Sequence, residues 1–184
     1  MCHQPRVREP VLTVGGDDVE ITSRRWGPHH STQAAILAGT GGYEVPGSVP
    51  YVKQFVHKTL IDDSCVTCHM ATAFGDKIGG HTMKMAHDSD TVNVSGCVFC
   101  HADIETFDLN GTQTEIAGLL DELKALLIAN NLIDNSGLAV PGIRSSDETG
   151  SLFNYLLILE DGSLGVHNPR YSRAILQNSI EALR

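Results

Sequence analysis

Two five-residue segments constrain this sequence most: Cys65-Val66-Thr67-Cys68-His69 and Cys97-Val98-Phe99-Cys100-His101. Both spell C-x-x-C-H, the attachment motif of c-type haem. The spacing suits that chemistry, because two thiols three residues apart reach the two vinyl groups of one porphyrin and the adjoining histidine then lies under the iron. We therefore expect each motif to bind one haem c through both of its cysteines (Cys65 and Cys68, Cys97 and Cys100), with His69 and His101 as axial ligands.

Other uses of paired cysteines explain less of this pattern. A four-cysteine zinc site would have to accept 28 residues between Cys68 and Cys97. Zinc ribbons usually have roughly 15 to 20 residues there, and zinc requires neither His69 nor His101. A redox-active dithiol is expected between the strand and the helix of a βαβ unit, which is not evident around either motif. A disulfide framework also leaves the histidines unexplained.

The fifth cysteine, Cys2, is followed directly by His3. If these are the last two residues of a third C-x-x-C-H motif, its first cysteine stands two positions before Met1, outside the sequence. We expect this arrangement, with His3 as the axial ligand of a third haem, because the adjoining histidine is what haem needs. The alternatives are that Met1 is an initiator before an ordinary thiol, or that Cys2 is lipidated.

A haem iron held by one histidine needs a second axial ligand, and the chain has nine histidines in total. We therefore expect bis-histidine ligation. His167 lies where Asn168 would cap a helix and Pro169 would begin it, which is a rigid place for a ligand. His81 follows Gly79 and Gly80, which would let the backbone approach a flat macrocycle closely.

The remaining histidines differ in their context. His57 lies eight residues before Cys65, near enough to serve a neighbouring haem. His29 and His30 are adjacent, and we expect only one of them to bind iron. We expect His87 to be a solvent residue. Met83 and Met85 are better explained as packing against porphyrin than as ligands.

The fold class predicted is mainly α with long loops, organised around haem. Residues 11–25 indicate a short β-hairpin around Gly15-Gly16-Asp17-Asp18. Apolar residues at helical spacing predict helices over 112–130, from 145 to about 160, where Ser145 and Glu148 form a capping box, and over 168–184. We expect residues 1–111 to be a loop-rich haem-binding region and residues 112–184 a helical region that covers the last haem, together forming one domain. Phe107 to Gly111 has only part of a calcium-loop pattern.

Composition excludes some partners. The net charge is −9, with 13 basic against 22 acidic residues and no cluster of Lys and Arg, so nucleic acid is not an expected partner. No run of 18 or more apolar residues is present, so no transmembrane segment is expected. Aromatic residues make up 5% of the chain and glycines number 18, which leaves modest material for a core.

The chain resembles the C-terminal part of bacterial multihaem c-type cytochromes at C-V-T-C-H, G-G-H-T, C-V-F-C-H and G-V-H-N-P-R-Y. The segment W-G-P-H-H-S-T-Q-A-A-I-L-A-G-T-G-G is similar to one that delivers a distal histidine in that group, which implies His29 rather than His30. The segment D-G-S-L-G-V-H-N-P-R-Y is similar to the group's terminal segment and implies His167 as a distal ligand. The resemblance also implies export, with a periplasmic or extracellular location, and closely stacked haems.

The expected function is electron transfer through about three bis-histidine haems, without catalysis. Some members of the resembled group assemble into extracellular filaments, so the expected partners are other redox proteins or copies of the chain itself. The alternative is a fragment of a multihaem oxidoreductase of the nitrite or hydroxylamine type, whose active haem keeps one axial position open.

Overall fold

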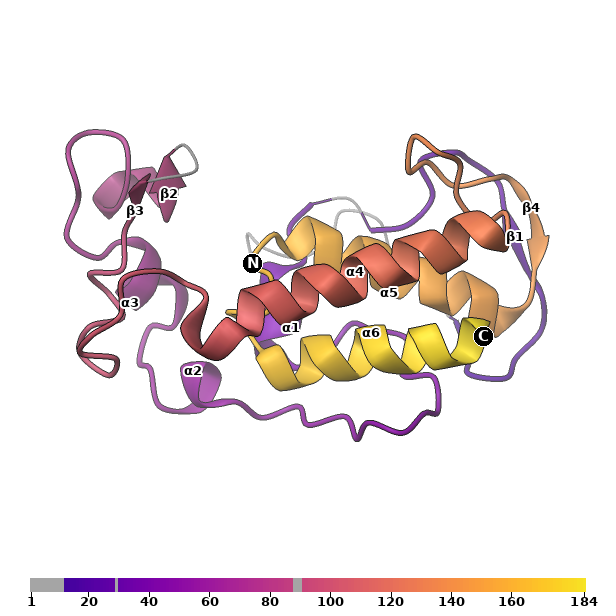
Figure 1. The fold of residues 1–184 in the computed structure, drawn as a ribbon, viewed down its shortest axis with the longest axis horizontal. Coiled ribbons are helices and arrows are strands. Elements are labelled where there is room, and N and C mark those ends of the chain that lie inside the picture. The colour runs from indigo at the N-terminus through magenta and orange to yellow at the C-terminus, as the bar shows by residue number, and fades with distance from the viewer. Residues whose placement is uncertain (1–11, 29, 88–90) are drawn as a thin grey trace. The chain divides into compact units, whose positions relative to one another are not determined.

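The structure is a computed structural model that describes residues 12–28, 30–87 and 91–184. The chain forms two compact units (Figure 1). Residues 1–55 and 112–184 form the first, which we call the helical unit, and residues 56–111 form the second, which we call the motif unit. The sequence analysis placed a boundary at residue 111, whereas the structure groups residues up to 55 with the helices.

The helical unit is built on three long helices. They are α4 (Thr112–Ala129), α5 (Ser146–Asp161) and α6 (Pro169–Leu183), and all three were predicted from the apolar periodicity. A short helix, α1 (Gln33–Ala38), contacts α5. In Figure 1, α5 runs opposite to α4 and α6, which run in the same direction.

The predicted helix starts are confirmed. The Ser145 hydroxyl accepts a hydrogen bond from the Glu148 backbone N–H at 3.3 Å, and the Glu148 carboxylate accepts one from the Ser145 N–H at 3.0 Å. The Asn168 side-chain oxygen accepts from the Tyr171 N–H at 3.1 Å, with Pro169 in the first turn. Both caps satisfy backbone donors that a helix start would otherwise leave unpaired.

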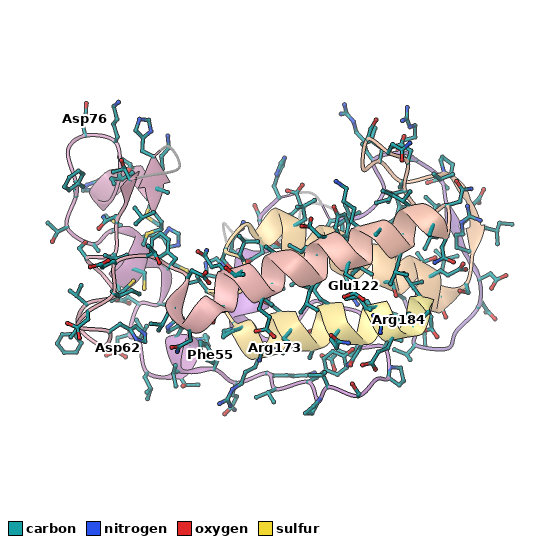
Figure 2. The ribbon with its side chains drawn as sticks, viewed as in Figure 1. Phe55, Asp62, Asp76, Glu122, Arg173 and Arg184 are labelled. Atoms are coloured by element: carbon teal, nitrogen blue, oxygen red, sulfur yellow. The ribbon has the colours of Figure 1, made fainter. Side chains whose placement is uncertain are left out.

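The core of the helical unit lies between the three long helices. The predicted apolar stripe of α4 and that of α6 both face this core, whose fully enclosed residues include Ile116, Leu123, Leu127, Leu152, Leu157, Tyr171, Ile175 and Ile180. Ion pairs join α4 and α6 at the surface. Arg173 reaches Glu115 at 2.5 Å, and Figure 2 shows Arg184 beside its partner Glu122.

The expected N-terminal hairpin is wrong in its pairing. Strand β1 (Val19–Ile21) pairs antiparallel with β4 (Gly142–Arg144), so that Glu20 lies opposite Ile143. Residues 12–14 are not a strand, and Val11 lies outside the described residues. The reason is tertiary: the Tyr43 hydroxyl contacts the Thr13 carbonyl and the Gly15 N–H, each at 3.3 Å, and so holds this segment in a turn.

The motif unit consists of loops and short elements. These are α2 (Val56–Thr59), α3 (Cys65–His69), β2 (Ala86–His87) paired with β3 (Thr91–Val92), and 3₁₀ turns at Gly80–Thr82 and Leu109–Gly111. The whole chain is therefore a mixed fold in which helices predominate over short strands. None of the helices within the described ranges has both the length and the apolar character needed to cross a bilayer.

A buried asparagine in α5 links that helix to the loop that follows α1. The Asn154 side chain bonds the Tyr43 N–H and C=O, both at 2.8 Å, and the Ser179 hydroxyl at 2.9 Å. We predict that Asn154→Ala lowers the free energy of unfolding by about 2 kcal/mol, because it leaves the Tyr43 N–H buried without its partner, while the Tyr43 carbonyl keeps only the bond from the Val45 N–H at 2.9 Å. Urea unfolding followed by circular dichroism measures this change.

Asn130→Ala is the matched control. The Asn130 side chain also donates to backbone carbonyls, those of Leu126 and Leu183, but at an exposed position. We expect this variant to lose less than about 1 kcal/mol, since water replaces the lost bonds. Equal losses of unfolding free energy in Asn154→Ala and Asn130→Ala would show that burial of the Asn154 hydrogen bonds adds no stability.

Candidate functional site

The two C-x-x-C-H motifs each occupy one turn of helix-like backbone. The first is helix α3 itself. In the second, the His101 N–H donates to the Cys97 carbonyl at 2.9 Å, and the Cys97 N–H donates to the Val94 carbonyl at 2.8 Å. Side chains three residues apart in such a turn lie on the same side. The local fold therefore gives each motif two thiols that face the same way.

The two motifs pack directly against each other. A Cβ added to Gly96, the residue before Cys97, would lie 3.1 Å from the Cys68 Cα and 3.1 Å from the Ala71 Cβ. Burial raises the pKa of the Cys68 thiol, and the neighbouring thiols of Cys65 and Cys100 raise it further. Burial likewise raises the pKa of Cys97, with Cys68 adding to the effect. These directions are opposite to those of an activated redox thiol, whose pKa is lowered.

Each of the four described cysteines is a free thiol, not part of a disulfide. Within the described ranges, no three His, Cys, Asp or Glu side chains form a group arranged to hold a metal ion. The Cys65 and Cys100 thiols thus lie close enough to Cys68 to raise the pKa of its thiol beyond the effect of burial.

The histidine of the first motif is oriented by a backbone carbonyl. His69 Nδ1 lies 2.8 Å from the Met83 carbonyl oxygen. Because a carbonyl only accepts, this contact assigns the proton to Nδ1 and the ring lone pair to Nε2. Metal-binding histidines commonly make this kind of contact, which fixes both tautomer and ring orientation. His69 therefore fits the role of an iron ligand through Nε2.

The histidine of the second motif has another histidine beside it. The ring centres of His57 and His101 are 6.4 Å apart, with the rings at 84° to each other. An imidazole nitrogen lies about 2 Å from a bound first-row metal and the ring centre roughly 1 Å beyond it, so imidazoles on opposite sides of one iron have centres roughly 6 Å apart. An edge-to-face contact between rings has a similar separation. The spacing of this pair fits a shared iron, and His57 comes from α2, outside the motif.

The motif unit has little apolar core of its own. Among its described residues, Ile78 is the one large apolar side chain that is fully buried. By contrast, seven of its large apolar side chains are exposed: Val56, Leu60, Val66, Phe74, Val98, Phe99 and Leu109. A unit of this size normally needs disulfides, a metal or another filler to supplement its core. Porphyrin would be such a filler.

The structure gives a different reason for the glycines before His81. Gly79 and Gly80 have positive φ angles of 74° and 51°. A Cβ at Gly79 would lie 2.4 Å from the Asn93 side-chain nitrogen and 2.9 Å from the Ala71 carbonyl. The glycine is therefore required by close packing of this chain on itself, and no approach to a macrocycle is needed to explain it. His81 itself is exposed, whereas His87, expected in solvent, is half-buried.

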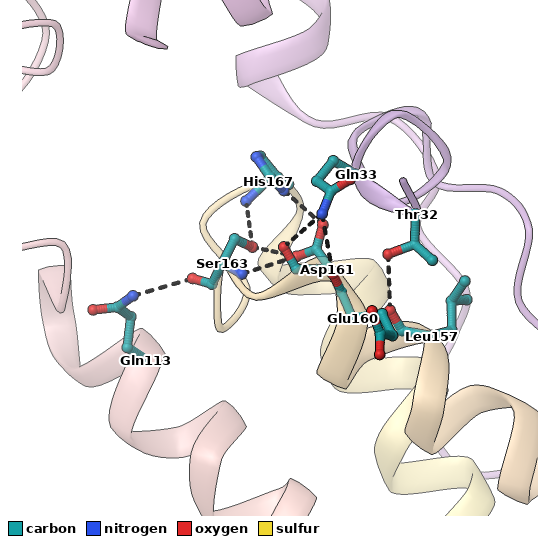
Figure 3. A network of polar contacts seen from close by, with 8 residues as sticks. All are labelled: Thr32, Gln33, Gln113, Leu157, Glu160, Asp161, Ser163 and His167. Carbon is teal, nitrogen blue, oxygen red and sulfur yellow. Dashed lines mark hydrogen bonds and ion pairs between the residues drawn. The ribbon is translucent and has the colours of Figure 1, made fainter. Parts of the chain in front are cut away.

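His167 lies in the helical unit and is held by a buried carboxylate. Its Nδ1 is 2.7 Å from Asp161 Oδ1, and the Asp161 side chain has no exposed surface, while 19% of the His167 side chain is exposed. The Ser163 hydroxyl donates to the other Asp161 oxygen and accepts from the His167 backbone N–H at 3.3 Å (Figure 3). A carboxylate–histidine pair of this kind is the usual outer support of a metal-binding imidazole.

The hydrogen bonds of Asp161, Ser163 and His167 differ in order from those of a serine hydrolase. In a hydrolase the serine hydroxyl bonds the far nitrogen of the histidine, whose near nitrogen bonds the aspartate. Here the Ser163 hydroxyl donates to Asp161 instead. This arrangement supports the carboxylate and the loop that carries His167.

His30 makes a similar contact at the surface. Its Nδ1 lies 2.9 Å from Glu160 Oε2, and 82% of its side chain is exposed. His29, which the resemblance favoured over His30, lies outside the described residues, as do Cys2 and His3. The structure therefore brings together the two complete motifs with His57, and separately places His30 and His167 at the end of α5.

The sequence analysis did not single out Asp161, although one signal was present. Glu160 and Asp161 stand at the C-terminal end of α5, where negative charge opposes the helix dipole. An acidic residue at such a position calls for a compensating partner, and a histidine follows six residues later. The Met83 carbonyl had no comparable signal, because backbone groups look alike in sequence.

Comparison with known proteins gave no match: no protein-family model, curated protein or solved structure is similar to this chain.

We predict that Gly79→Ala loosens the motif unit. The added methyl group has no room, and the left-handed backbone adds strain. Hydrogen exchange measured by mass spectrometry should become faster in peptides covering residues 71–96. Gly75→Ala is the matched control, since Gly75 has a positive φ of 65° but nothing within 4 Å of the added atom. Similar acceleration in both variants would show that backbone conformation alone matters.

Proposed function

We propose that this protein carries electrons through covalently bound haem c. One haem would be attached at Cys65 and Cys68 with His69 as an axial ligand, and a second at Cys97 and Cys100 with His101. Haem c, when bound, supplies one-electron redox chemistry. The proposal extends the resemblance to bacterial multihaem c-type cytochromes.

The observation that carries the proposal is the packing of the motif unit. Two complete attachment motifs contact each other in a unit that buries one large apolar side chain and exposes seven, counted over its described residues. Bound haem would add apolar volume beside both motifs, which would supplement this core, and it would explain the C-x-x-C-H spacing.

The residues around the motifs would keep each iron in a fixed environment. The Met83 carbonyl orients His69, and His57, whose ring centre lies 6.4 Å from that of His101, would hold the same iron as His101. Two histidine ligands fill both axial positions in either oxidation state, so little rearrangement accompanies electron arrival. The contact between the motifs through Gly96 and Cys68 would bring the two haems near each other.

A third haem, with His3 as ligand and Cys2 as an attachment point, is part of the proposal. His29, His81 and His167 are the further distal ligands proposed. We also propose that the chain is exported and works in the periplasm or outside the cell. Its partners would be other redox proteins or copies of itself, and with copies of itself it would form a filament. Its net charge of −9 would favour partners with basic surfaces.

The first test counts haems on the full chain expressed with export and haem-attachment machinery. We expect intact mass and the absorbance spectrum to give at least two haems, and a third would assign Cys2. The paired variant Cys65→Ser/Cys68→Ser and the paired variant Cys97→Ser/Cys100→Ser should each lose one haem. A chain without a Soret band that binds one zinc ion through its thiols would overturn the proposal.

The second test concerns the ligand opposite His101. We predict that His57→Ala keeps both covalent haems but converts one from low-spin to high-spin, because that iron loses an axial ligand. Electronic absorption and electron paramagnetic resonance spectra report the change. His87→Ala, in the same unit, is the control and should stay low-spin.

High-spin haem in the unmodified chain, or new absorption bands on adding nitrite or cyanide, would indicate an open axial position. That result would favour the oxidoreductase alternative over electron transfer alone. Unchanged low-spin spectra in His57→Ala would show that His57 and His101 make an edge-to-face contact only.

A further inference from the structure

The candidate axial histidines are supported by different chemical groups. His69 Nδ1 is in contact with a neutral backbone carbonyl at 2.8 Å, that of Met83. His167 Nδ1 is in contact with the carboxylate of Asp161 at 2.7 Å. A hydrogen bond to a carboxylate makes an imidazole a stronger electron donor than a hydrogen bond to a carbonyl does. The two ligands would therefore affect their irons differently.

Asp161 lies at a position that is unfavourable for a carboxylate. Its side chain has no exposed surface, and it is the last residue of α5, where the helix dipole is negative. Burying a carboxylate costs stability unless hydrogen bonds compensate for the lost water. Asp161 receives bonds from His167 and from the Ser163 hydroxyl, and its Oδ2 also lies 3.3 Å from the Ser163 N–H.

The loop between Asp161 and His167 is held from two sides. The Gln33 side chain, from α1, donates to the Asp161 carbonyl at 3.3 Å and the Glu160 carbonyl at 3.0 Å. The Gln113 side chain, from α4, donates to the Ser163 carbonyl at 3.1 Å (Figure 3). On the far side of His167, Asn168 donates to the Lys53 carbonyl at 3.0 Å while capping α6. The carboxylate and the imidazole are thus fixed relative to each other by several elements.

We propose that Asp161 is a positioning residue that orients His167 and lowers the midpoint potential of the haem that His167 binds. This inference rests on the proposed function, in which His167 is an axial ligand. A nearby negative charge stabilises Fe(III), which carries one more positive charge than Fe(II). Because the Asp161 side chain is buried, salt and water screen its charge weakly.

The test substitutes Asp161→Asn in the full haem-loaded chain. Asparagine has the same shape, and its side-chain oxygen can accept the His167 Nδ1–H, so this contact is kept while the charge is lost. Its NH2 group then faces Ser163 in place of Oδ2, so the bonds from Ser163 change as well. We expect the midpoint potential of one haem to rise and the others to stay unchanged in a spectroelectrochemical titration. The low-spin electron paramagnetic resonance signal of that same haem should shift, because the imidazole donates less strongly.

Glu160→Gln is the matched control. It removes one negative charge from the adjacent residue, whose partner His30 has a largely exposed side chain. Solvent screens this charge, so we expect a smaller shift in potential than for Asp161→Asn. Urea unfolding checks that the Asp161→Asn variant keeps the unfolding midpoint of the helical unit close to that of the unmodified chain. If the midpoint falls, Ser163→Ala is used in place of Asp161→Asn, because it is a milder change to the surroundings of the same carboxylate.

The outcomes separate the two proposals. Absence of haem from the unmodified chain would contradict the proposed function. Bound low-spin haem with potentials and spectra unchanged in Asp161→Asn would overturn the inference alone. Equal shifts for Asp161→Asn and Glu160→Gln would also overturn it, because they would show a general charge effect without a role for the contact with His167.

Discussion

The shortage of apolar core in residues 56–111 is the constraint on which the motif unit depends. Its described part buries Ile78 and leaves seven large apolar side chains exposed, several of them within or beside the attachment motifs. The helical unit faces no such shortage, because α4, α5 and α6 enclose a continuous apolar cluster. The same chain thus contains one unit with a continuous apolar core and one whose own side chains supply little apolar core.

Three of the histidines have specific neighbours that hold their rings in place. A carbonyl fixes His69, a second histidine lies beside His101, and a buried carboxylate fixes His167. Each contact orients an imidazole, which is what a metal-binding histidine requires. The supporting groups differ in charge, and this difference is a means by which a protein can give chemically identical haems different potentials.

Local patterns predicted much of the fold. The three long helices and the caps at Ser145 and Asn168 follow from spacing within about four residues, and the structure has them where expected. The hairpin prediction failed because β1 pairs with β4, far along the chain, while Tyr43 holds residues 13–15 in a turn. Gly79 was predicted to let the backbone approach a macrocycle. In the structure, close packing against Asn93 and Ala71 is what requires a glycine there.

The sequence by itself determined the chemistry that the chain offers: two C-x-x-C-H motifs, a surplus of histidines and three amphipathic helices. These features are local, because thiol spacing and helical periodicity depend on residues a few positions apart. Only the tertiary structure decided that the two motifs contact each other, that His57 lies beside His101, and that a buried Asp161 supports His167. Such contacts depend on burial and on how loops close, and neither burial nor loop closure is encoded in the spacing of a motif.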